Sequence, residues 1–156
     1  MADDIVMKIE GIKGESKIKD MKEYIDIVSV GFGIANSGTM SSGGGGGAGK
    51  ATFDDVHIVK KVDKASAALA KACASGKHIS EAKLHFRKQG EGQKEYLTVT
   101  LNDLIVSHWN FGHHDHPEHL TLNFSKITYD YKEQDNKGST TGTTSFGYDV
   151  KTMNIT

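Results

Sequence analysis

The chain has 156 residues, with 19 lysines and arginines against 20 aspartates and glutamates, and a formal net charge of −1. This length suits one domain, residues 1–156, with a core large enough to fold without metal or disulfide support. The balanced charge excludes the broad basic surface on which sequence-independent nucleic-acid binding depends, so we expect no nucleic-acid partner. Cys73 is the only cysteine, so no intrachain disulfide can form.

The N-terminal segment "MADDIVMKIEG" carries acids where a secretory signal peptide has basic and apolar residues, so we expect no such signal. No stretch of the chain is apolar over the length of a membrane span, and we expect no membrane insertion. Val6–Ile9 predicts a short strand. The charges and the two glycines of Gly11–Lys22 predict an exposed loop.

The segment Glu23–Asn36 predicts one long strand, because bulky and small residues alternate with a period of two. Its bulky face is expected to pack on the core and consists of Val28, Val30, Phe32 and Ile34. The opposite face consists of Ser29, Gly31 and Gly33. We expect this small, polar face to border water or another backbone.

After a glycine run, Ala51–Val62 predicts another strand, and Asp63–His78 predicts a helix. Asp63 or Ser66 is expected to cap the start of this helix, and Gly76 suits the left-handed position after its end. Small apolar residues at helical spacing form a stripe that should lie close against a sheet: Ala65, Leu69, Ala72 and Cys73.

Four further strands are predicted at Glu81–Lys88, Lys94–Trp109, His119–Lys132 and Ser145–Ile155. The alternation in the third of these changes phase at Ser125–Lys126, which predicts a bulge. Many strands around one helix favour a mainly β fold over a βαβ layout. We expect a small antiparallel β-barrel with one flanking α-helix.

The glycine run "MSSGGGGGAGKATF", Met40–Phe53, matches a phosphate-binding loop up to Lys50. The next residue, Ala51, has no hydroxyl for a magnesium ion, and a strand rather than a helix is predicted to follow. We therefore expect no nucleotide and no other cofactor. Because glycine permits close approach of two backbones, we expect an arm that contacts a neighbouring subunit. The candidate contact residues are Gly43, Gly44, Gly45, Gly46, Gly47, Ala48, Gly49 and Lys50.

The segment His108–Leu120 holds five histidines and two acids, which is a composition typical of metal sites. It has no H-E-x-x-H pattern, however, and Pro117 disfavours the helix on which that pattern depends. We expect a polar turn between two strands, with no metal ligands and no catalytic residues, and the role of residues 113–119 stays open. The acids of the chain are expected on solvated faces.

Six stretches, in chain order, resemble one known family: "VMKIEGIKGES", "IDIVSVGFGIANSG", "GGGGGAGKATFDDVHIVKKVDKAS", "LAKACASGKH", "AKLHFRK" and "YLTVTLNDLIVS". This family is the haemolysin-coregulated protein (Hcp) family, the tube subunits of bacterial type VI secretion systems. The resemblance is close from Val6 to Ser107 and looser from there to the C-terminus. It is specific, because "DKAS" and "SGKH" after a glycine arm do not form a general pattern. One departure is Ala67, where family members often have proline.

The resemblance implies a homohexameric ring with a wide channel, and rings stacked into a tube. It implies three kinds of partner besides the chain itself: a contractile sheath, a spike protein and small effectors carried in the channel. The tube would be cytoplasmic before firing and then secreted without a signal peptide, in virulence or bacterial competition. Ser29, Gly31 and Gly33 become the candidates for lining the channel. The resemblance implies no enzymatic activity.

Two other classes of protein stay open on the residues alone. One is a monomeric β-barrel module that binds a carbohydrate or peptide ligand. The other is an enzyme that depends on a metal at the histidine-rich turn or on a nucleotide at the glycine run. The mass in solution separates a ring from these alternatives, because a ring has several times the mass of the subunit.

Overall fold

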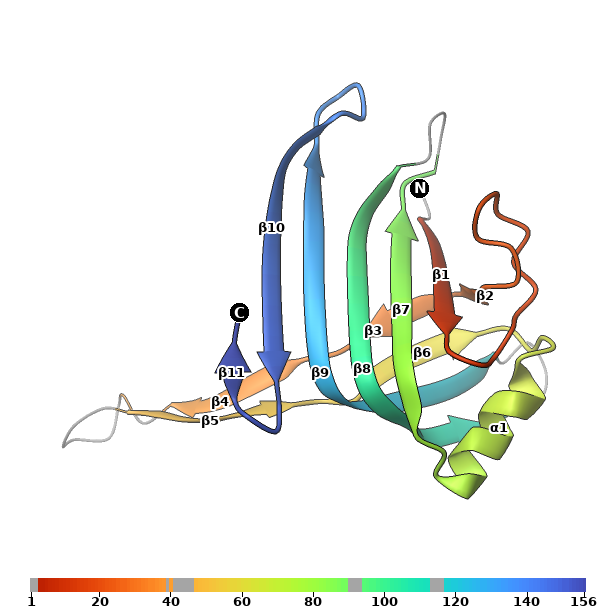
Figure 1. Ribbon diagram of the computed structural model, residues 1–156, viewed down its shortest axis with the longest axis horizontal. Coiled ribbons are helices and arrows are strands. Elements are labelled where there is room, and N and C mark those ends of the chain that lie inside the picture. Colours follow the sequence, from red (N-terminus) through yellow and green to blue (C-terminus); the bar gives the residue numbers. More distant parts are fainter. Residues whose placement is uncertain (1–2, 39, 41–46, 90–93, 113–116) are drawn as a thin grey trace.

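The chain is built almost entirely from antiparallel strands (Figure 1). The computed structural model describes residues 3–38, 40, 47–89, 94–112 and 117–156. The elements are β1 (Asp4–Ile9), β2 (Ile25–Ile27), β3 (Ser29–Gly31), β4 (Ile34–Gly38), β5 (Ala48–Phe53), β6 (Val56–Lys60), α1 (Ser66–Ser75), β7 (Ile79–Arg87), β8 (Glu95–Asn110), β9 (Glu118–Gln134), β10 (Thr140–Asp149) and β11 (Asn154–Ile155).

The main sheet has the strand order β11-β10-β9-β8-β7-β1-β2, and β6 pairs with both β9 and β3. A single residue, Val28, separates β2 from β3, so the pairings lead from β1 through β2, β3, β6, β9, β8 and β7 back to β1. The circuit is completed at Val28 by the covalent chain and by its N–H, which donates to the carbonyl of Val59 at 2.7 Å. The predicted mainly β, antiparallel fold with one helix is confirmed.

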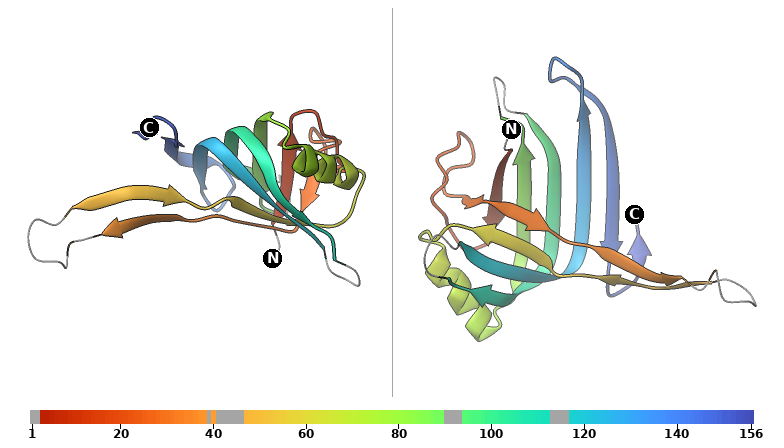
Figure 2. Two further views of the ribbon diagram at one scale, coloured as in Figure 1. Left: turned by 90° about the horizontal axis from the view of Figure 1, so that it is seen from below. Right: turned by 180° about the vertical axis from the view of Figure 1, so that it is seen from behind.

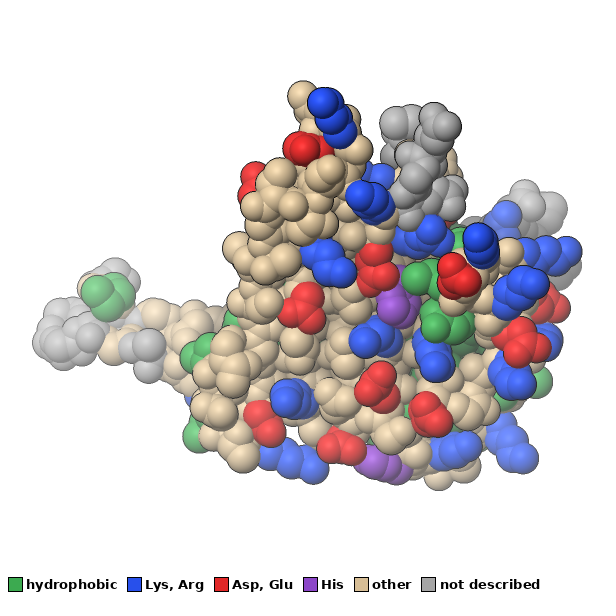
Figure 3. Space-filling model, turned by 45° about the horizontal axis from the view of Figure 1, so that its top comes forward, with side chains coloured by type: hydrophobic (Ala, Val, Ile, Leu, Met, Phe, Trp, Pro, Cys, Tyr) green, Lys and Arg blue, Asp and Glu red, His purple; other side chains and the backbone are tan. Residues whose placement is uncertain are grey.

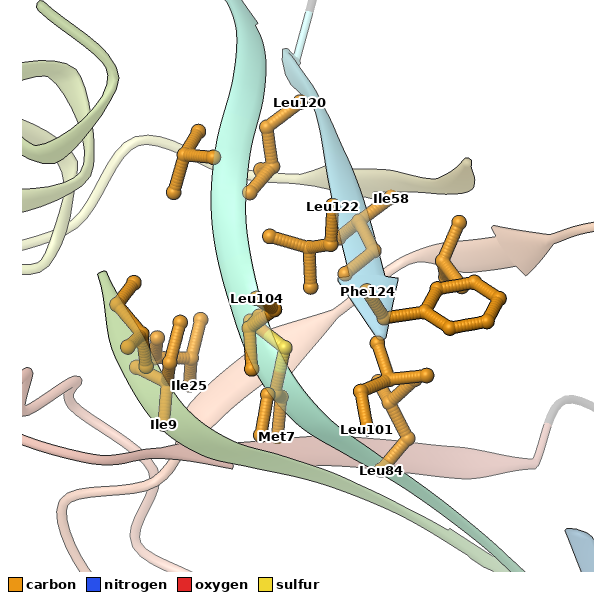
Figure 4. Close-up of a cluster of buried hydrophobic side chains, with 14 of the residues drawn as sticks. Met7, Ile9, Ile25, Ile58, Leu84, Leu101, Leu104, Leu120, Leu122 and Phe124 are labelled. Atoms are coloured by element: carbon orange, nitrogen blue, oxygen red, sulfur yellow. The ribbon is translucent and has the colours of Figure 1, made fainter. Parts of the chain in front are cut away.

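The core lies inside this circuit, where side chains from β1, β2, β6, β7, β8 and β9 converge (Figure 4). The apolar residues that alternate along β7, β8 and the first half of β9 are buried or pack against the core. Burying each such aliphatic side chain stabilises the fold by about 1.5–3 kcal/mol. The fully buried apolar residues include Met7, Ile25, Ile58, Leu69, Leu84, Leu101, Leu104, Leu120, Leu122 and Ile127.

Helix α1 packs beside β8, as the predicted stripe requires (Figure 1). Leu69 and Ala72 are buried, and Cys73 packs against the core from a partly exposed position. Gly76 ends the helix in the left-handed conformation with φ of 61°. The helix begins at Ser66 without a side-chain cap, because its N-cap residue is Ala65. Of the two predicted caps, the Asp63 carboxylate accepts a hydrogen bond from the Ala65 N–H at 2.9 Å in the turn before the helix, and the Ser66 hydroxyl takes part in a buried network described below.

The prediction of one long strand over Glu23–Asn36 is wrong, because the structure divides it into β2, β3 and β4. Val30 and Phe32 pack against the core as expected, but Val28 is 54% exposed and Ile34 is 48% exposed. The buried residues before the break are Ile25 and Ile27, one position out of phase with Val30. The phase changes at Val28, since there the chain leaves β1 as its partner and takes up β6.

The predicted exposed loop of Gly11–Lys22 is buried at every second residue over its first half, at Ile12, Gly14 and Ser16. Its backbone runs beside the segment before β2, with the N–H of Gly14 donating to the carbonyl of Glu23 at 2.7 Å. A Cβ added at Gly14 would lie 2.5 Å from the carbonyl oxygen of Tyr24. Glycine at this position therefore allows the two backbone segments to pack closely, and it does not mark an exposed loop.

The phase change predicted on β9 is present, but it is not caused by a bulge at Ser125–Lys126. Buried residues change phase on both β8 and β9 at the same level, where Asp103 and Ser125 drop out of the ladder and Asp103 has a φ of 50°. The two strands bend together there (Figure 1). The register shift of this ladder lies instead between Val106 and His108.

Candidate functional site: a projecting arm and a polar sheet face

Strands β4 and β5 form a two-stranded ribbon that projects from the body of the molecule (Figures 1 and 2). We call this ribbon, residues 34–38 and 48–53, the arm. Its strands pair antiparallel, with Ile34 opposite Phe53, and among the described strands they pair only with each other. Every residue of β4 is exposed. A free two-stranded ribbon is marginally stable and offers unpaired backbone groups along both edges.

The arm is held closely within itself and at its base. The Asn36 amide donates to the carbonyl of Gly49 at 2.8 Å. A Cβ added at Gly49 would clash with the Oγ of Ser37 and lie 2.7 Å from the Ser37 carbonyl oxygen. At the base, the ring of Phe53 stacks on Tyr148 with centroids 4.5 Å apart and meets Phe124 edge-on. These contacts fix where the arm leaves the sheet.

The described residues among the predicted contact residues fall in this arm or directly before β5. Gly43, Gly44, Gly45 and Gly46 lie outside the described residues, whereas Gly47 is exposed and Ala48, Gly49 and Lys50 belong to β5. Because β5 runs on to Phe53, Lys50 is followed by strand and not by the helix of a phosphate-binding loop. That part of the sequence analysis is confirmed.

A second surface is formed by one side of β3, β6, β9 and β8, which the right-hand view of Figure 2 shows next to one another. Residues directly opposite each other in adjacent antiparallel strands lie on the same side of a sheet. The register therefore defines two rows, and we call them together the polar face. The rows are Gly31, His57, Thr121 and His108, and Ser29, Val59, His119 and Asn110.

The carboxylate of Asp55 links β8 and β9 at one end of the polar face. It accepts a hydrogen bond from the Ser107 hydroxyl at 2.6 Å and another from the Asn123 amide at 2.8 Å. Ser107 also shares a 2.7 Å hydrogen bond with the Thr121 hydroxyl. This carboxylate is therefore already engaged with neutral polar groups from β8 and β9.

Of the three predicted channel residues, the structure brings Ser29 and Gly31 together on the polar face, where both are exposed. A Cβ added at Gly31 would have nothing within 4 Å. Gly33 lies apart from them, near the base of the arm. Its carbonyl accepts from the N–H of Asp54 at 2.9 Å, and a Cβ there would lie 2.9 Å from the Asp54 carboxylate.

On the other side of β6 and β9, a buried ion pair joins Lys60 to Glu118. The Lys60 ammonium donates to Glu118 at 2.8 Å, to Asp63 at 2.9 Å and to the carbonyl of Lys61 at 2.9 Å. The Ser66 hydroxyl donates to the same Glu118 oxygen at 2.5 Å. The indole N–H of Trp109 donates to the other oxygen at 2.6 Å. The network thus connects β6, β8, β9 and the start of α1.

The sequence analysis missed this network, since it placed the acids on solvated faces. A signal was present, because Lys60 shares the inward alternation of Val56 and Ile58, and Glu118 shares that of Leu120 and Leu122. A charge at a core position of each of two paired strands indicates a buried ion pair. Lys60 and Glu118 are indeed opposite each other in the β6–β9 ladder.

The far end of the main sheet carries a smaller titratable cluster. Burial alone would raise the pKa of Glu95, but hydrogen bonds from His85 and Thr98 and the charges of His85 and Lys132 lower that pKa below its ordinary value. The His85 ring lies 2.9 Å from the Glu95 carboxylate. Burial and a hydrogen bond to Asp3 raise the pKa of Tyr96 to about 12.

Charges of both signs are interspersed over the surface shown in Figure 3. Among the described residues, no group of three or more histidine, cysteine, aspartate or glutamate side chains is placed to hold a metal ion. Within the same ranges, no helix has the length and apolar character of a membrane span.

The family model described as "Type VI secretion system effector, Hcp" matches residues 6–131 of this chain. Protein hcp1 of Pseudomonas aeruginosa is 41% identical over 97% of this chain and 97% of its own length. The crystal structure of Hcp1 from Salmonella typhimurium is 37% identical, with a TM-score of 0.81 and full coverage of both chains. A structure described as a type six secretion system protein is 26% identical, with a TM-score of 0.91 over 99% of this chain and 100% of its own.

The fold and these matches together define a protein of the type VI secretion system. The chain belongs to the Hcp family, and it is a structural tube protein rather than an enzyme. The family resemblance seen in the sequence is thereby confirmed.

Proposed function

We propose that this chain forms a closed ring of six subunits, and that the rings stack into a tube through the arm. The observation that carries the proposal is the arm itself, a projecting ribbon whose strands find no third strand among the described residues. Exposed strand edges are normally paired or covered, and a repeated head-to-tail contact that closes gives a ring. Formation of hexameric tube rings is the property of the family to which the chain belongs.

In this proposal, the arm contacts the neighbouring subunit through Gly43–Lys50. The adjoining part of the arm favours this role, because β4 is exposed along its whole length and Gly49 already requires close backbone approach. The arm base also carries exposed apolar surface, since Ile34 is 48% exposed. Covering that surface with a neighbouring subunit would stabilise the assembly.

The channel is lined by the polar face, with Ser29 and Gly31 among its lining residues and Gly33 at its margin. Its exposed small side chains leave room for a bound protein, and no charge of either sign dominates it. The cargo of the channel is a small effector protein. The tube lies within a contractile sheath, ends in a spike protein, and is fired from the cytoplasm.

Light scattering after size-exclusion chromatography tests the ring. We expect a mass six times that of the 16.9 kDa subunit. A monomer at high protein concentration would favour a monomeric ligand-binding module instead.

To test the arm, valine replaces Gly44, Gly45 and Gly46 together. Circular dichroism should still show a folded β protein, while tube formation and secretion fall. A variant that stacks and is secreted like the parent would show that the arm is a passive linker.

The channel is tested by Gly31→Arg, which places a long side chain in open space on the polar face. The ring should form as before, but recovery of small effectors bound to it should fall. The matched control is an arginine at Lys61, which is exposed and lies outside the two rows of the polar face. Equal effector recovery from both variants would place the channel on another surface.

A further inference from the structure

The segment that joins β10 to β11 and continues to residue 156 is firmly held although it lies on the surface. We call residues 149–156 the β10–β11 turn. The Asp149 carboxylate accepts hydrogen bonds from the N–H groups of Lys151 at 2.9 Å and Thr152 at 3.1 Å. Beyond the turn, Thr156 and Gly147 exchange two backbone hydrogen bonds of 2.9 and 3.1 Å. The backbone is therefore fixed at both ends within the subunit.

The β10–β11 turn presents apolar side chains to solvent. Met153 is 55% exposed, Ile155 is 68% exposed, and Val150 is exposed as well. Met153 also has a φ of 58°, in the left-handed region that costs free energy for a residue with a Cβ. The subunit thus holds a strained apolar residue where it gains no burial of its own. Strain at an exposed apolar residue indicates a contact made outside the subunit.

A hollow at the opposite side of the molecule has a complementary character. It has a volume of about 440 Å³ and is lined by residues of β2 and of the segment that follows β6. Its lining includes two exposed valines, Val28 and Val62. The front and rear views place β2 and β11 at opposite sides of the molecule (Figures 1 and 2). A hollow of this volume has room for several side chains.

The rim of this hollow carries unpaired negative charge. Glu15 and Asp26 line it, and neither carboxylate has a hydrogen bond or ion pair within the described part of the chain. Asp63 also lines it, but its carboxylate is held by the Lys60 ammonium at 2.9 Å. Lys61 is the remaining charged lining residue, so two free carboxylates outweigh one ammonium. The hollow therefore favours a ligand that combines apolar side chains with a positive charge.

We propose that the β10–β11 turn of one subunit occupies this hollow on the next subunit, with Met153 against the two valines and the Lys151 ammonium at the two free carboxylates. The inference rests on the ring proposed above. A contact between two different patches at opposite sides of a subunit repeats head to tail and can close a ring. The β10–β11 turn also lies beside the base of the arm, because Tyr148 pairs with Ile155 and stacks on Phe53. The turn and the arm base therefore belong to one side of the subunit.

Cross-linking of the assembled full chain tests the contact. The variant carries Asp26→Cys and Lys151→Cys, with Cys73→Ala to remove the native thiol, and is treated with a short bis-maleimide. Because the two positions lie at opposite sides of a subunit, the reagent joins neighbours, and a denaturing gel should show a ladder from dimer to hexamer. Each single-cysteine variant should give no ladder. A second control combines Lys151→Cys with Lys71→Cys, which is exposed on α1 and does not line the hollow.

Light scattering distinguishes failure of the ring from failure of the contact. A parent chain that is monomeric would overturn the proposed ring together with this contact. A parent chain that forms the ring, combined with a ladder no stronger than that of the Lys71→Cys control, would overturn the contact alone.

Charge reversal tests the ion pairing. Lys151→Glu places like charges together, so the subunit concentration at which the ring dissociates should rise at least about fivefold. Adding Asp26→Lys to the same chain restores opposite charges and should recover part of this loss. Sedimentation velocity over a dilution series measures both. A ring that is unchanged by Lys151→Glu, or a double variant without recovery, would overturn the ion pairing.

Met153→Gly separates the contact from folding, because glycine adopts a φ of 58° without strain. The urea midpoint of the dissociated subunit should not fall, whereas the ring should dissociate at a concentration at least about fivefold higher. The matched control is Asp20→Gly, since Asp20 is exposed, has a φ of 68° and does not line the hollow. Ring dissociation of Met153→Gly at the concentration found for the control would overturn the role of Met153.

Discussion

Lys60 and Glu118 form an ion pair 2.8 Å long in which both side chains are completely buried. They come from different halves of the chain and lie opposite each other in the β6–β9 ladder, which is part of the circuit of strands. The pair also reaches the start of α1 through Ser66 and β8 through Trp109. One charged contact thus fixes the relative positions of four elements.

We expect Glu118→Leu to destabilise the chain by about 3–5 kcal/mol, because it leaves the Lys60 ammonium buried with Asp63 as its remaining carboxylate. The double variant with Lys60→Met should be more stable than Glu118→Leu alone, since it removes the uncompensated charge. Urea unfolding measures both free energies. Lys61→Met, at an exposed neighbouring position, is the control and should change little. Additive effects of the two core changes would show that the pair has no coupling energy.

The division of the predicted long strand gives a test at two valines, Val28 and Val30, which lie two positions apart. Val30→Asp should destabilise the subunit by about 1–3 kcal/mol or more, because Val30 packs against the core. Val28→Asp should leave the subunit folded, because Val28 is 54% exposed. Thermal unfolding of the two variants compares them directly. A larger loss at Val28 than at Val30 would contradict the observed faces.

The alternation of residues predicted most strands and their inward faces, since periodicity depends only on local sequence. It could not predict the break at Val28, because that break arises where the chain exchanges β1 for β6 as its partner. For the same reason it joined Ile25 and Ile34 into one strand. The shared bend of β8 and β9 at Asp103 was visible as a phase change on β9, but a phase change alone does not distinguish a bend from a bulge.

The candidate site was less accessible from sequence than the fold. The glycine run marked the arm, and the failed match at Ala51 excluded a phosphate-binding loop, because both depend on neighbouring residues. The gathering of His57 with His108 and His119 depends on which strands pair, and β6 pairs with β9 across half of the chain. Five of the eight histidines drew attention to one turn, whereas the polar face also carries His57 from outside that turn.

The pH dependence of stability should reflect Glu95. The pKa of this carboxyl is lowered in the folded chain relative to its ordinary value of 4.5, so its charged form stabilises the fold. The stabilisation is present above pH 4.5 and is lost as the pH falls through the lowered pKa of the folded state. Glu95→Gln should therefore be less stable than the parent at pH 6, and the difference should shrink below pH 4.5. Urea unfolding across this range measures it, and a difference independent of pH would contradict the assignment.

Two glycines in the arm provide a matched pair for assembly. Gly49→Ala should disrupt the arm, because its Cβ would clash with Ser37, whereas Gly38→Ala meets nothing within 4 Å. Both variants should keep the core stability of the parent, since Gly38 and Gly49 lie away from the contacts of Phe53 that hold the described arm to the body. Light scattering and electron microscopy should show impaired ring or tube assembly for Gly49→Ala alone. If both variants assembled equally well, the close contact at Gly49 would not be needed for the arm's proposed role in assembly.

The pairing of β6 with β9 also affects how the chain folds while it is being synthesised. Glu118 is synthesised 58 residues after Lys60, and this delay is roughly 3–12 s at ordinary rates of synthesis. During this interval β6 has β3 but not β9 beside it, and apolar segments with an unpaired edge aggregate unless a charge interrupts them. Lys60 supplies that charge, and its ammonium group stays hydrated until Glu118 is available to pair with it. We expect nascent chains halted before Glu118 to aggregate more with Lys60→Met than with Lys61→Met; equal aggregation would contradict this protective role.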